Sequence, residues 1–290
     1  MSQANAAPAV IAQRRWKRPP VLVLVSFAAI GLLVLIAVFA DLLAPYGYRD
    51  QALLNRLAAP VFLGGSWDHV LGTDQLGRDL LSRLLYAIRF SLSIAFLGTI
   101  IGAILGTFLG LLAASLRGWT GETIMMMVDV QASLPFMILA LAVLAFFGNN
   151  LTLFVLVIGI NGWEVYARLA RGAALSVRAR GYAQAIYAFG ASEWRLYLRH
   201  VLPNIAAVLI VQFTLNFPQT ILLETSLSFL GLGVQPPLTS LGQMLGDGRN
   251  YLLTAWWMAV LPGAVTFIAT LSVSLIGDWL RDRLDPTLAD

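Results

Sequence analysis

One uncharged stretch, residues 90–116, limits the kind of fold that this chain can adopt: FSLSIAFLGTIIGAILGTFLGLLAASL, bracketed by Arg89 and Arg117. The hydrocarbon core of a bilayer is about 30 Å thick and is crossed by roughly 20 apolar residues of helix. The stretch is therefore long enough to span a membrane. The whole chain is 59% hydrophobic and 12% charged, about half the charged share of an average soluble protein. This composition argues against a soluble globular domain, a disordered chain or a nucleic-acid-binding protein.

Further apolar runs occur on both sides of this stretch, and residues 21–40 form the first of them. Because that run is longer than a signal-peptide core and lacks a good cleavage site, we expect a retained helix. Residues 130–163 are too long for one span, and the turn-forming sequence Gly148-Asn149-Asn150 divides them. We predict an all-α integral membrane protein with six transmembrane helices. The predicted spans cover residues 21–40, 90–116, 124–147, 151–167, 205–227 and 252–277.

The distribution of basic residues predicts the orientation of these spans. Of the 19 basic residues, 18 are Arg and only Lys17 is Lys. With the N-terminus in the cytoplasm, 13 of the 19 lie on the cytoplasmic side, as the positive-inside rule favours. We therefore expect both termini, residues 1–20 and 281–290, to be cytoplasmic tails. Residues 41–89 are then an extracytoplasmic segment, and residues 168–204 a cytoplasmic loop.

Glycine and proline residues within the spans suggest how the helices pack. Glycine recurs at every fourth position of the second span, at Gly98, Gly102, Gly106 and Gly110. This spacing predicts a seam on one helical face where another backbone approaches closely. Pro135 and Pro218 are each expected to kink a helix.

Three carboxylates lie in or at the ends of spans. We expect Asp129 and Glu164 to pair with Arg168 or Arg171. For Glu224, the tendency of intramembrane carboxylates to pair favours a structural role over a position on the transport pathway.

The cytoplasmic loop is helical in composition and broken at Gly190. Tyr182, Ile186 and Phe189 fall on one face of its first half, and Ser192 can cap a second helix. That helix is expected to end before Pro203, because the residue before proline disfavours helical backbone angles. An exposed apolar face on such a helix–turn–helix is typical of a docking site for a partner protein. The alternative is an interfacial helix that rests on lipid, although lipid binding would not need the bend at Gly190.

The loop resembles the EAA loop of bacterial ABC importer permeases. Members of that family typically have Glu-Ala-Ala, three residues, Gly, nine residues and then a hydrophobic-x-Leu-Pro sequence. Here Gly190, Leu202 and Pro203 match in place and spacing, and His200 takes the hydrophobic position. Gln184 stands where Glu is usual and Ile186 where the second Ala is usual. The resemblance implies that this loop docks on an ATPase subunit through Tyr182, Gln184, Ala185, Ile186, Phe189, Gly190, Ala191, Ser192, His200, Leu202 and Pro203.

Two extracytoplasmic motifs resemble the dipeptide/oligopeptide/nickel branch of this family, and within it the C-type subunit. The first motif is Leu71-Gly72-Thr73-Asp74 with Gly77-Arg78-Asp79, and the second runs from Ser228 to Pro237. The outer-face residues that the resemblance implies are Gly72, Thr73, Asp74, Gly77, Arg78, Asp79, Phe229, Gly231, Gly233, Pro236 and Pro237. The resemblance extends over nearly the whole chain and implies a type I importer fold, with an ABC transmembrane type-1 domain at residues 90–280.

The resemblance also implies the partners of the chain. These are a second permease subunit of B type, two ABC ATPase subunits that carry ATP and Mg²⁺, and an extracytoplasmic solute-binding protein that delivers a peptide-like solute. The chain itself has no phosphate-binding loop, and its only lysine lies in the N-terminal tail. It has no cysteine, and His69 and His200 fall on opposite sides of the membrane in this topology, so no cofactor, catalytic residue or metal site is expected.

Two other function classes remain as alternatives. An ion-coupled secondary transporter would be expected to have inverted repeats and charges at the membrane midplane, and no clear repeat is present. A membrane-embedded enzyme would need a catalytic constellation that the sequence lacks. Neither alternative gives the cytoplasmic loop a role. The sequence leaves open whether the solute is a dipeptide, oligopeptide, glutathione, nickel chelate or opine, and whether the permease dimer is homomeric or heteromeric.

Overall fold

The fold is given by a computed structural model, which describes residues 19–116, 118–179 and 192–284. Within these residues the protein is helical, and its only β-type pairing is an isolated antiparallel bridge between Thr73 and Asp79. The main helices are α1 (Val21–Leu43), α2 (Leu80–Ser115), α3 (Trp119–Ser133), α4 (Phe136–Phe147), α5 (Leu151–Gly159), α6 (Trp163–Arg178), α8 (Glu193–Leu196), α9 (Leu202–Phe229), α10 (Leu241–Gly248) and α11 (Trp257–Leu284). Short 3₁₀ turns occupy Leu53–Asn55, Val61–Leu63, Trp67–His69 and Arg249–Tyr251.

Five helical stretches are long and apolar enough to cross a membrane, or six if the bent pair α3–α4 counts as one span. Their mean hydropathy is highest in α1, at 3.1, and α1 is also the least buried of the five. Many of its large side chains are exposed, as expected for a helix in contact with lipid. The all-α membrane fold that the sequence predicts is therefore confirmed.

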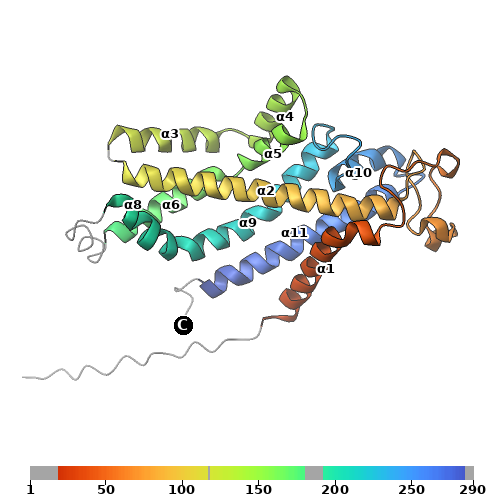
Figure 1. Cartoon of the computed structure of the whole chain (residues 1–290), viewed down its shortest axis with the longest axis horizontal. Helices are drawn as coiled ribbons and strands as arrows, with labels where there is room; N and C mark the ends of the chain where they lie inside the picture. The colour runs from red at the N-terminus through yellow and green to blue at the C-terminus, as the bar shows by residue number, and fades with distance from the viewer. Residues whose placement is uncertain (1–18, 117, 180–191, 285–290) are drawn as a thin grey trace, which may run out of the picture.

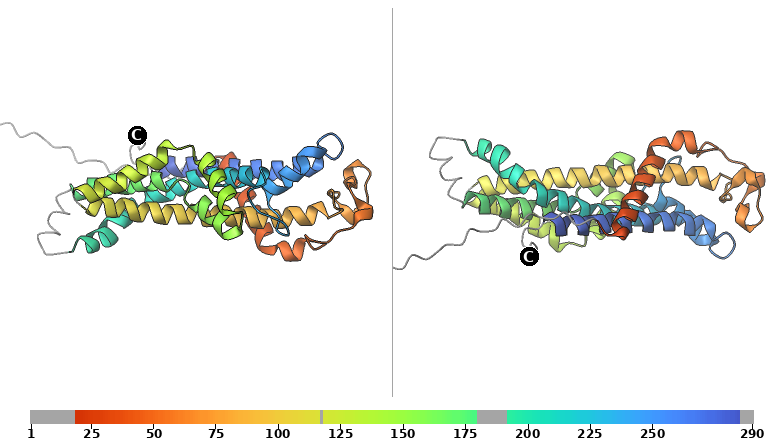
Figure 2. Two further views of the ribbon diagram at one scale, coloured as in Figure 1. Left: turned by 90° about the horizontal axis from the view of Figure 1, so that it is seen from above. Right: turned by 90° about the horizontal axis from the view of Figure 1, so that it is seen from below.

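The helices form an elongated bundle around α2 (Figure 1). α6 and α9 lie along α2, and α1 and α11 lie side by side along another part of the bundle. The segment between α1 and α2 extends from one end of the bundle, near α10 (Figures 1 and 2). We call this the outer end, after the side on which the arginine distribution places it. α8 lies at the opposite end (Figure 1).

The glycine seam on α2 is confirmed. All four glycines are buried, and each faces the broken span formed by α5 and α6. A Cβ atom at Gly102 would lie 3.0 Å from the carbonyl oxygens of Gly159 and Asn161, and one at Gly106 would overlap the carbonyl oxygen of Trp163. The absence of side chains along this face lets the two backbones pack closely, which is how small residues stabilise helix pairs in membranes.

The predicted kink at Pro135 is present as a bend of 90° between α3 and α4. The chain then turns at Gly148, whose φ is +83°, between α4 and α5. A further break separates α5 from α6 at Gly162, which has a left-handed conformation with φ of +80°. A Cβ atom at Gly162 would collide with the Asn216 side chain of α9. Pro218, in contrast, lies within α9, a helix that continues through it.

The expectation that the helix before Pro203 ends at that residue is wrong. α8 continues through a π-helical turn, η4 (Tyr197–Val201), directly into α9. Leu202 keeps helical angles, with φ −57° and ψ −45°, and its N–H donates to the carbonyl of Tyr197. Pro203 follows this π-helical turn, after Leu202, inside the continuous helical run. The π-helical turn changes the hydrogen-bond ladder at the point where proline supplies no N–H.

α2 is longer than a bilayer requires. It begins at Leu80, where the Asp79 side chain caps it by accepting from the Ser82 N–H, whereas the predicted span begins at residue 90. At 1.5 Å per residue the helix is about 54 Å long. Its first turns therefore extend beyond the hydrocarbon core at the outer end. At the other side of the bundle, α6 continues to Arg178, so residues 168–178 of the predicted cytoplasmic loop are helical.

We predict that Gly106→Leu strongly destabilises the protein, because the new side chain would force α2 away from α6. Overpacking of this kind costs about 1–3 kcal/mol, occasionally more. The measurement is thermal stability of the purified protein in detergent. Gly31→Leu is the matched control, since Gly31 lies in α1 with no atom within 4 Å of a Cβ position. Equal melting temperatures for the two variants would contradict the close packing.

Candidate functional site

The first outer motif folds into a tight loop that leads directly into α2. Gly72 and Gly77 have φ of +78° and +71°, a backbone conformation that glycine adopts without strain. The Thr73 hydroxyl is buried, accepts from the Ala58 N–H at 2.8 Å and donates to the Asn55 carbonyl. Asp79 accepts from the Ser82 hydroxyl at 2.8 Å and contacts Nδ1 of His69 at 3.1 Å. The motif is thus held in one conformation by buried hydrogen bonds.

Four charged side chains form a network at the centre of the outer end. Asp74 is completely buried and accepts from Arg78 Nε at 2.6 Å and from the Arg83 guanidinium. Arg83 is 1% exposed and also donates to Asp247 of α10 at 3.2 Å. Asp74 Oδ1 further accepts the backbone N–H groups of Leu76 and Arg78. Each buried charge therefore has an opposite charge beside it, which is the condition for stable burial.

This network joins two parts of the chain that are far apart in sequence. Asp74 and Arg78 belong to the first outer motif, whereas Asp247 lies in α10, which follows the second motif. The sequence identifies Asp74 and Arg78 as candidates but gives no indication of Arg83 or Asp247. Arg83 could have been suspected only as a charge close to the start of an apolar helix, because the pairing with Asp247 depends on the fold.

Glu224 in α9 is completely buried and surrounded by hydroxyl groups. The Ser228 hydroxyl donates to its Oε1 at 2.8 Å, and the hydroxyls of Thr225, Ser91 and Ser240 also face it. Ser91 Oγ in addition accepts the backbone N–H of Leu241 at 3.0 Å. The cluster links α2, α9 and α10, which supports the structural role expected for Glu224.

The second outer motif lines a polar cavity beside the charge network. Gly231 takes a left-handed turn with φ of +83°, and the Asn149 side chain donates to the Gly233 carbonyl at 2.7 Å. The cavity has a volume of about 410 Å³. Its walls come from residues 228–231 and 234–236, from α10, from residues 249–251 and from Gln75 of the first motif. Phe229, Gly231 and Pro236 of the predicted outer-face residues thus line one cavity, together with Asp247.

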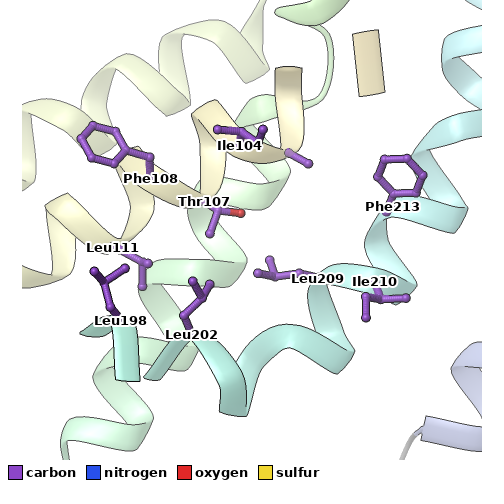
Figure 3. A pocket seen from close by; sticks show the side chains of 10 residues that line it. Ile104, Thr107, Phe108, Leu111, Leu198, Leu202, Leu209, Ile210 and Phe213 are labelled. Atoms are coloured by element: carbon purple, nitrogen blue, oxygen red, sulfur yellow. The ribbon is translucent and has the colours of Figure 1, made fainter. Parts of the chain in front are cut away.

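A second cavity of about 450 Å³ lies nearer the other end of the bundle, between α2 and α9. The close-up shows side chains from α2 facing those of η4 and α9 across the space (Figure 3). Its lining is Ala103, Ile104, Thr107, Phe108, Leu111, Leu198, Leu202, Leu209, Ile210 and Phe213. Only Thr107 offers a polar side chain, so this cavity has no charged group to neutralise an ionic solute.

The predicted ATPase-coupling residues are divided between described and undescribed parts of the chain. Tyr182, Gln184, Ala185, Ile186, Phe189, Gly190 and Ala191 lie outside the described residues. Ser192 is exposed, and its hydroxyl accepts the Arg195 N–H at 3.4 Å, so the predicted cap is present. His200 lies in η4, and Leu202 and Pro203 begin α9.

The predicted pairing of the span-end carboxylates is partly correct. Arg168 pairs with Asp129 at 3.3 Å, as expected. Arg171 pairs instead with Glu122 at 2.7 Å. For Glu164 the prediction is wrong, because its Oε2 is buried without a hydrogen-bond partner in the described structure. Its position in the first turn of α6 places it next to the unpaired N–H groups and the positive end of that helix. Among the described residues no group of three or more His, Asp or Glu side chains could hold a metal ion.

The apolar spans, the broken helices and the charged outer end define a multi-pass membrane protein. Comparison with known proteins identifies its class. Residues 106–290 match the family described as binding-protein-dependent transport system inner membrane component. Residues 12–60 match the N-terminal TM domain of oligopeptide transport permease C.

Named relatives are similar over almost the whole chain. The di/tripeptide transport system permease protein DppC of Pseudomonas aeruginosa is 43% identical over 258 residues, covering 89% of this chain and 85% of the relative. The dipeptide transport system permease protein DppC of Escherichia coli strain K12 is 39% identical, covering 91% and 88%. The glutathione transport system permease protein GsiD of Pectobacterium atrosepticum is 37% identical, covering 89% and 84%.

A solved structure of the MetNI methionine ABC transporter in an inward-facing conformation has a similar fold. The TM-score is 0.56 at 19% identity, covering 71% of this chain and 98% of the matched chain. The chain belongs to the family of binding-protein-dependent transport system inner membrane components. It is a multi-pass permease subunit of an ABC importer with the type I fold, and not an enzyme, since the ATPase of such importers is a separate subunit.

We predict that Asp74→Asn destabilises the protein, because Arg83 would keep its buried charge without its main partner. Removing one member of a buried pair costs about 3–5 kcal/mol, and we expect the lower end because Asp247 still faces Arg83. Chemical denaturation in detergent measures the effect. Asp41→Asn is the control, since the contact of Asp41 with Arg89 is exposed and such pairs contribute little. Unchanged stability of Asp74→Asn would show that the network is not structural.

Proposed function

We propose that this permease imports short peptides or glutathione-like solutes, which an extracytoplasmic binding protein delivers to its outer end. The observation that carries the proposal is the naming of its relatives, which are permeases for di/tripeptides, dipeptides and glutathione at 37–43% identity. The polar outer cavity supports it, because a charged or strongly polar solute needs hydrogen-bonding groups where it leaves water.

The proposed assembly has four further subunits. One permease of B type completes the pathway, two ATPase subunits bind ATP and Mg²⁺, and a binding protein selects the solute. Each ATPase would dock on the cytoplasmic loop of a permease, here residues 168–204 around Gly190. Coupling requires that the loop make different contacts in the inward-facing and outward-facing states, since a partner shifts an equilibrium only by its differential affinity.

Reconstitution in liposomes tests the proposal, with subunits omitted one at a time. We expect ATP-dependent uptake of a labelled dipeptide only when both permeases, the ATPases and the binding protein are present. The permease alone should transport nothing, because it contains no site for ATP. Uptake by this chain alone, driven by an ion gradient, would contradict the proposal and favour a secondary transporter.

The orientation is part of the proposal, with both termini and the loop at residues 168–204 in the cytoplasm. Because the protein has no native cysteine, single cysteines can report it. Cysteine at Ser66 or Thr254, both exposed at the outer end, should react with an impermeant thiol reagent added to intact cells. Cysteine at Ser192, which is also exposed, should react only after the membrane is made permeable. Labelling of Ser192→Cys in intact cells would show that this loop lies outside the cytoplasm, and would contradict the proposed orientation.

A further inference from the structure

The outer cavity contains polar groups whose hydrogen bonds are not satisfied by the protein. The side-chain oxygens of Gln75 and Gln243 are buried and have no hydrogen-bond partner in the described structure, and both residues line the cavity. Buried polar atoms without partners are rare in proteins, because each one costs free energy. Several side-chain atoms of the described residues are buried without a partner, and two of them belong to amides that line this one cavity. A rotation of either amide would offer its oxygen to an N–H donor of a ligand in the cavity.

A cation stands at the same cavity. Arg249 lines it, with its guanidinium carbon 5.6 Å from the centre of the Phe229 ring. No ion pair joins Arg249 to a carboxylate among the residues that the structure describes. The guanidinium is thus positioned against the cavity wall by a cation–π contact and keeps its hydrogen-bond donors available for an anion.

The other charge at the cavity is already neutralised within the protein. Asp247 accepts from Arg83 at 3.2 Å and lies 3.8 Å from Arg78. The four charges of the network, Asp74, Arg78, Arg83 and Asp247, sum to zero. Arg249 therefore gives the cavity a net positive charge, which favours an anionic group such as a carboxylate.

These three features describe one kind of ligand. We propose that the outer cavity is an entry site for the carboxyl-terminal end of a short peptide, with its carboxylate at Arg249 and its N–H groups on Gln75 and Gln243. The inference rests on the proposed peptide import and adds to it the site and the group that is recognised. A volume of about 410 Å³ lies within the range of small-molecule sites, roughly 300–1,000 Å³. The apolar cavity between α2 and α9 offers neither the cation nor the unpaired amides.

The test uses the reconstituted transporter without its binding protein, so that only the permeases can bind the peptide. A cysteine is placed at Asn250, which lines the cavity and is exposed, and its reaction rate with an impermeant maleimide is measured. We expect millimolar alanyl-alanine to slow the reaction, and its C-terminal amide, which lacks the carboxylate, to have little effect. Cysteine at Ser66, outside the cavity, should react at the same rate with or without either compound.

The second part of the experiment substitutes the side chains that are proposed to bind the peptide. In the Asn250→Cys background, Arg249→Gln should raise the alanyl-alanine concentration for half-protection roughly two- to fivefold, since Arg249 is exposed and an exposed ion pair contributes up to about 1 kcal/mol. Gln243→Leu should raise it by a smaller factor. Arg56→Gln is the matched control, because Arg56 is an exposed arginine of the outer segment and does not line the cavity.

Several outcomes would overturn the inference. Equal protection by the amide, or unchanged protection in Arg249→Gln, would show that no carboxylate is recognised. An unreactive Asn250→Cys would mean that the second permease covers the cavity. In a separate sample to which the empty binding protein is added, protection by that protein, with none by the dipeptide alone, would assign the cavity to protein docking. Normal dipeptide uptake by the complete transporter without any protection would reject this site and leave the proposed function intact.

Discussion

The close contact between α2 and the broken α5–α6 span is the constraint on which the rest of the fold depends. Four glycines bring the two backbones together along one face of α2, and α9 and α1 pack against other parts of the same helix. Because α2 is longer than the membrane is thick, it also carries Arg83 beyond the hydrocarbon core to the charged network. The same helix thus contains both the glycine seam and Arg83 of the charged network, and so sets the distance between them.

The two ends of the bundle differ in how their interiors accommodate charged groups. At the outer end, Asp74 and Arg83 are buried as partners, and Glu224 is enclosed by hydroxyl groups. The carboxylates of Asp74 and Glu224 thereby gain hydrogen bonds that replace those lost with water. Nearer the opposite end the interior between α2 and α9 is apolar, and the pairs that involve Arg168 and Arg171 lie towards the surface. Of the two cavities described above, the polar one therefore lies at the outer end and the apolar one lies nearer the opposite end.

Local features of the sequence predict much of this structure. The period of Gly98–Gly110, the bend at Pro135, the turn at Gly148 and the cap at Ser192 each follow from the properties of a few neighbouring residues. Features that depend on distant partners are not predictable in this way. The ion pair between Arg83 and Asp247 is one example. The break at Gly162 is another, because a Cβ atom there would collide with the Asn216 side chain. The prediction that a helix ends before Pro203 failed for a different reason. The residue before a proline usually avoids helical backbone angles, but here a π-helical turn, which is rare, lets the helix continue.

The unbroken run of helix from residue 193 to residue 229 has a mechanical consequence. It is roughly 55 Å long, and it joins the segment next to Gly190 to Phe229 in the wall of the outer cavity. Two points along it lack an ordinary hydrogen-bond ladder: the π-helical turn followed by Pro203, and the turn that contains Pro218. The run is therefore one continuous helical connection between its two ends, and it contains two points of the kind at which helices commonly bend.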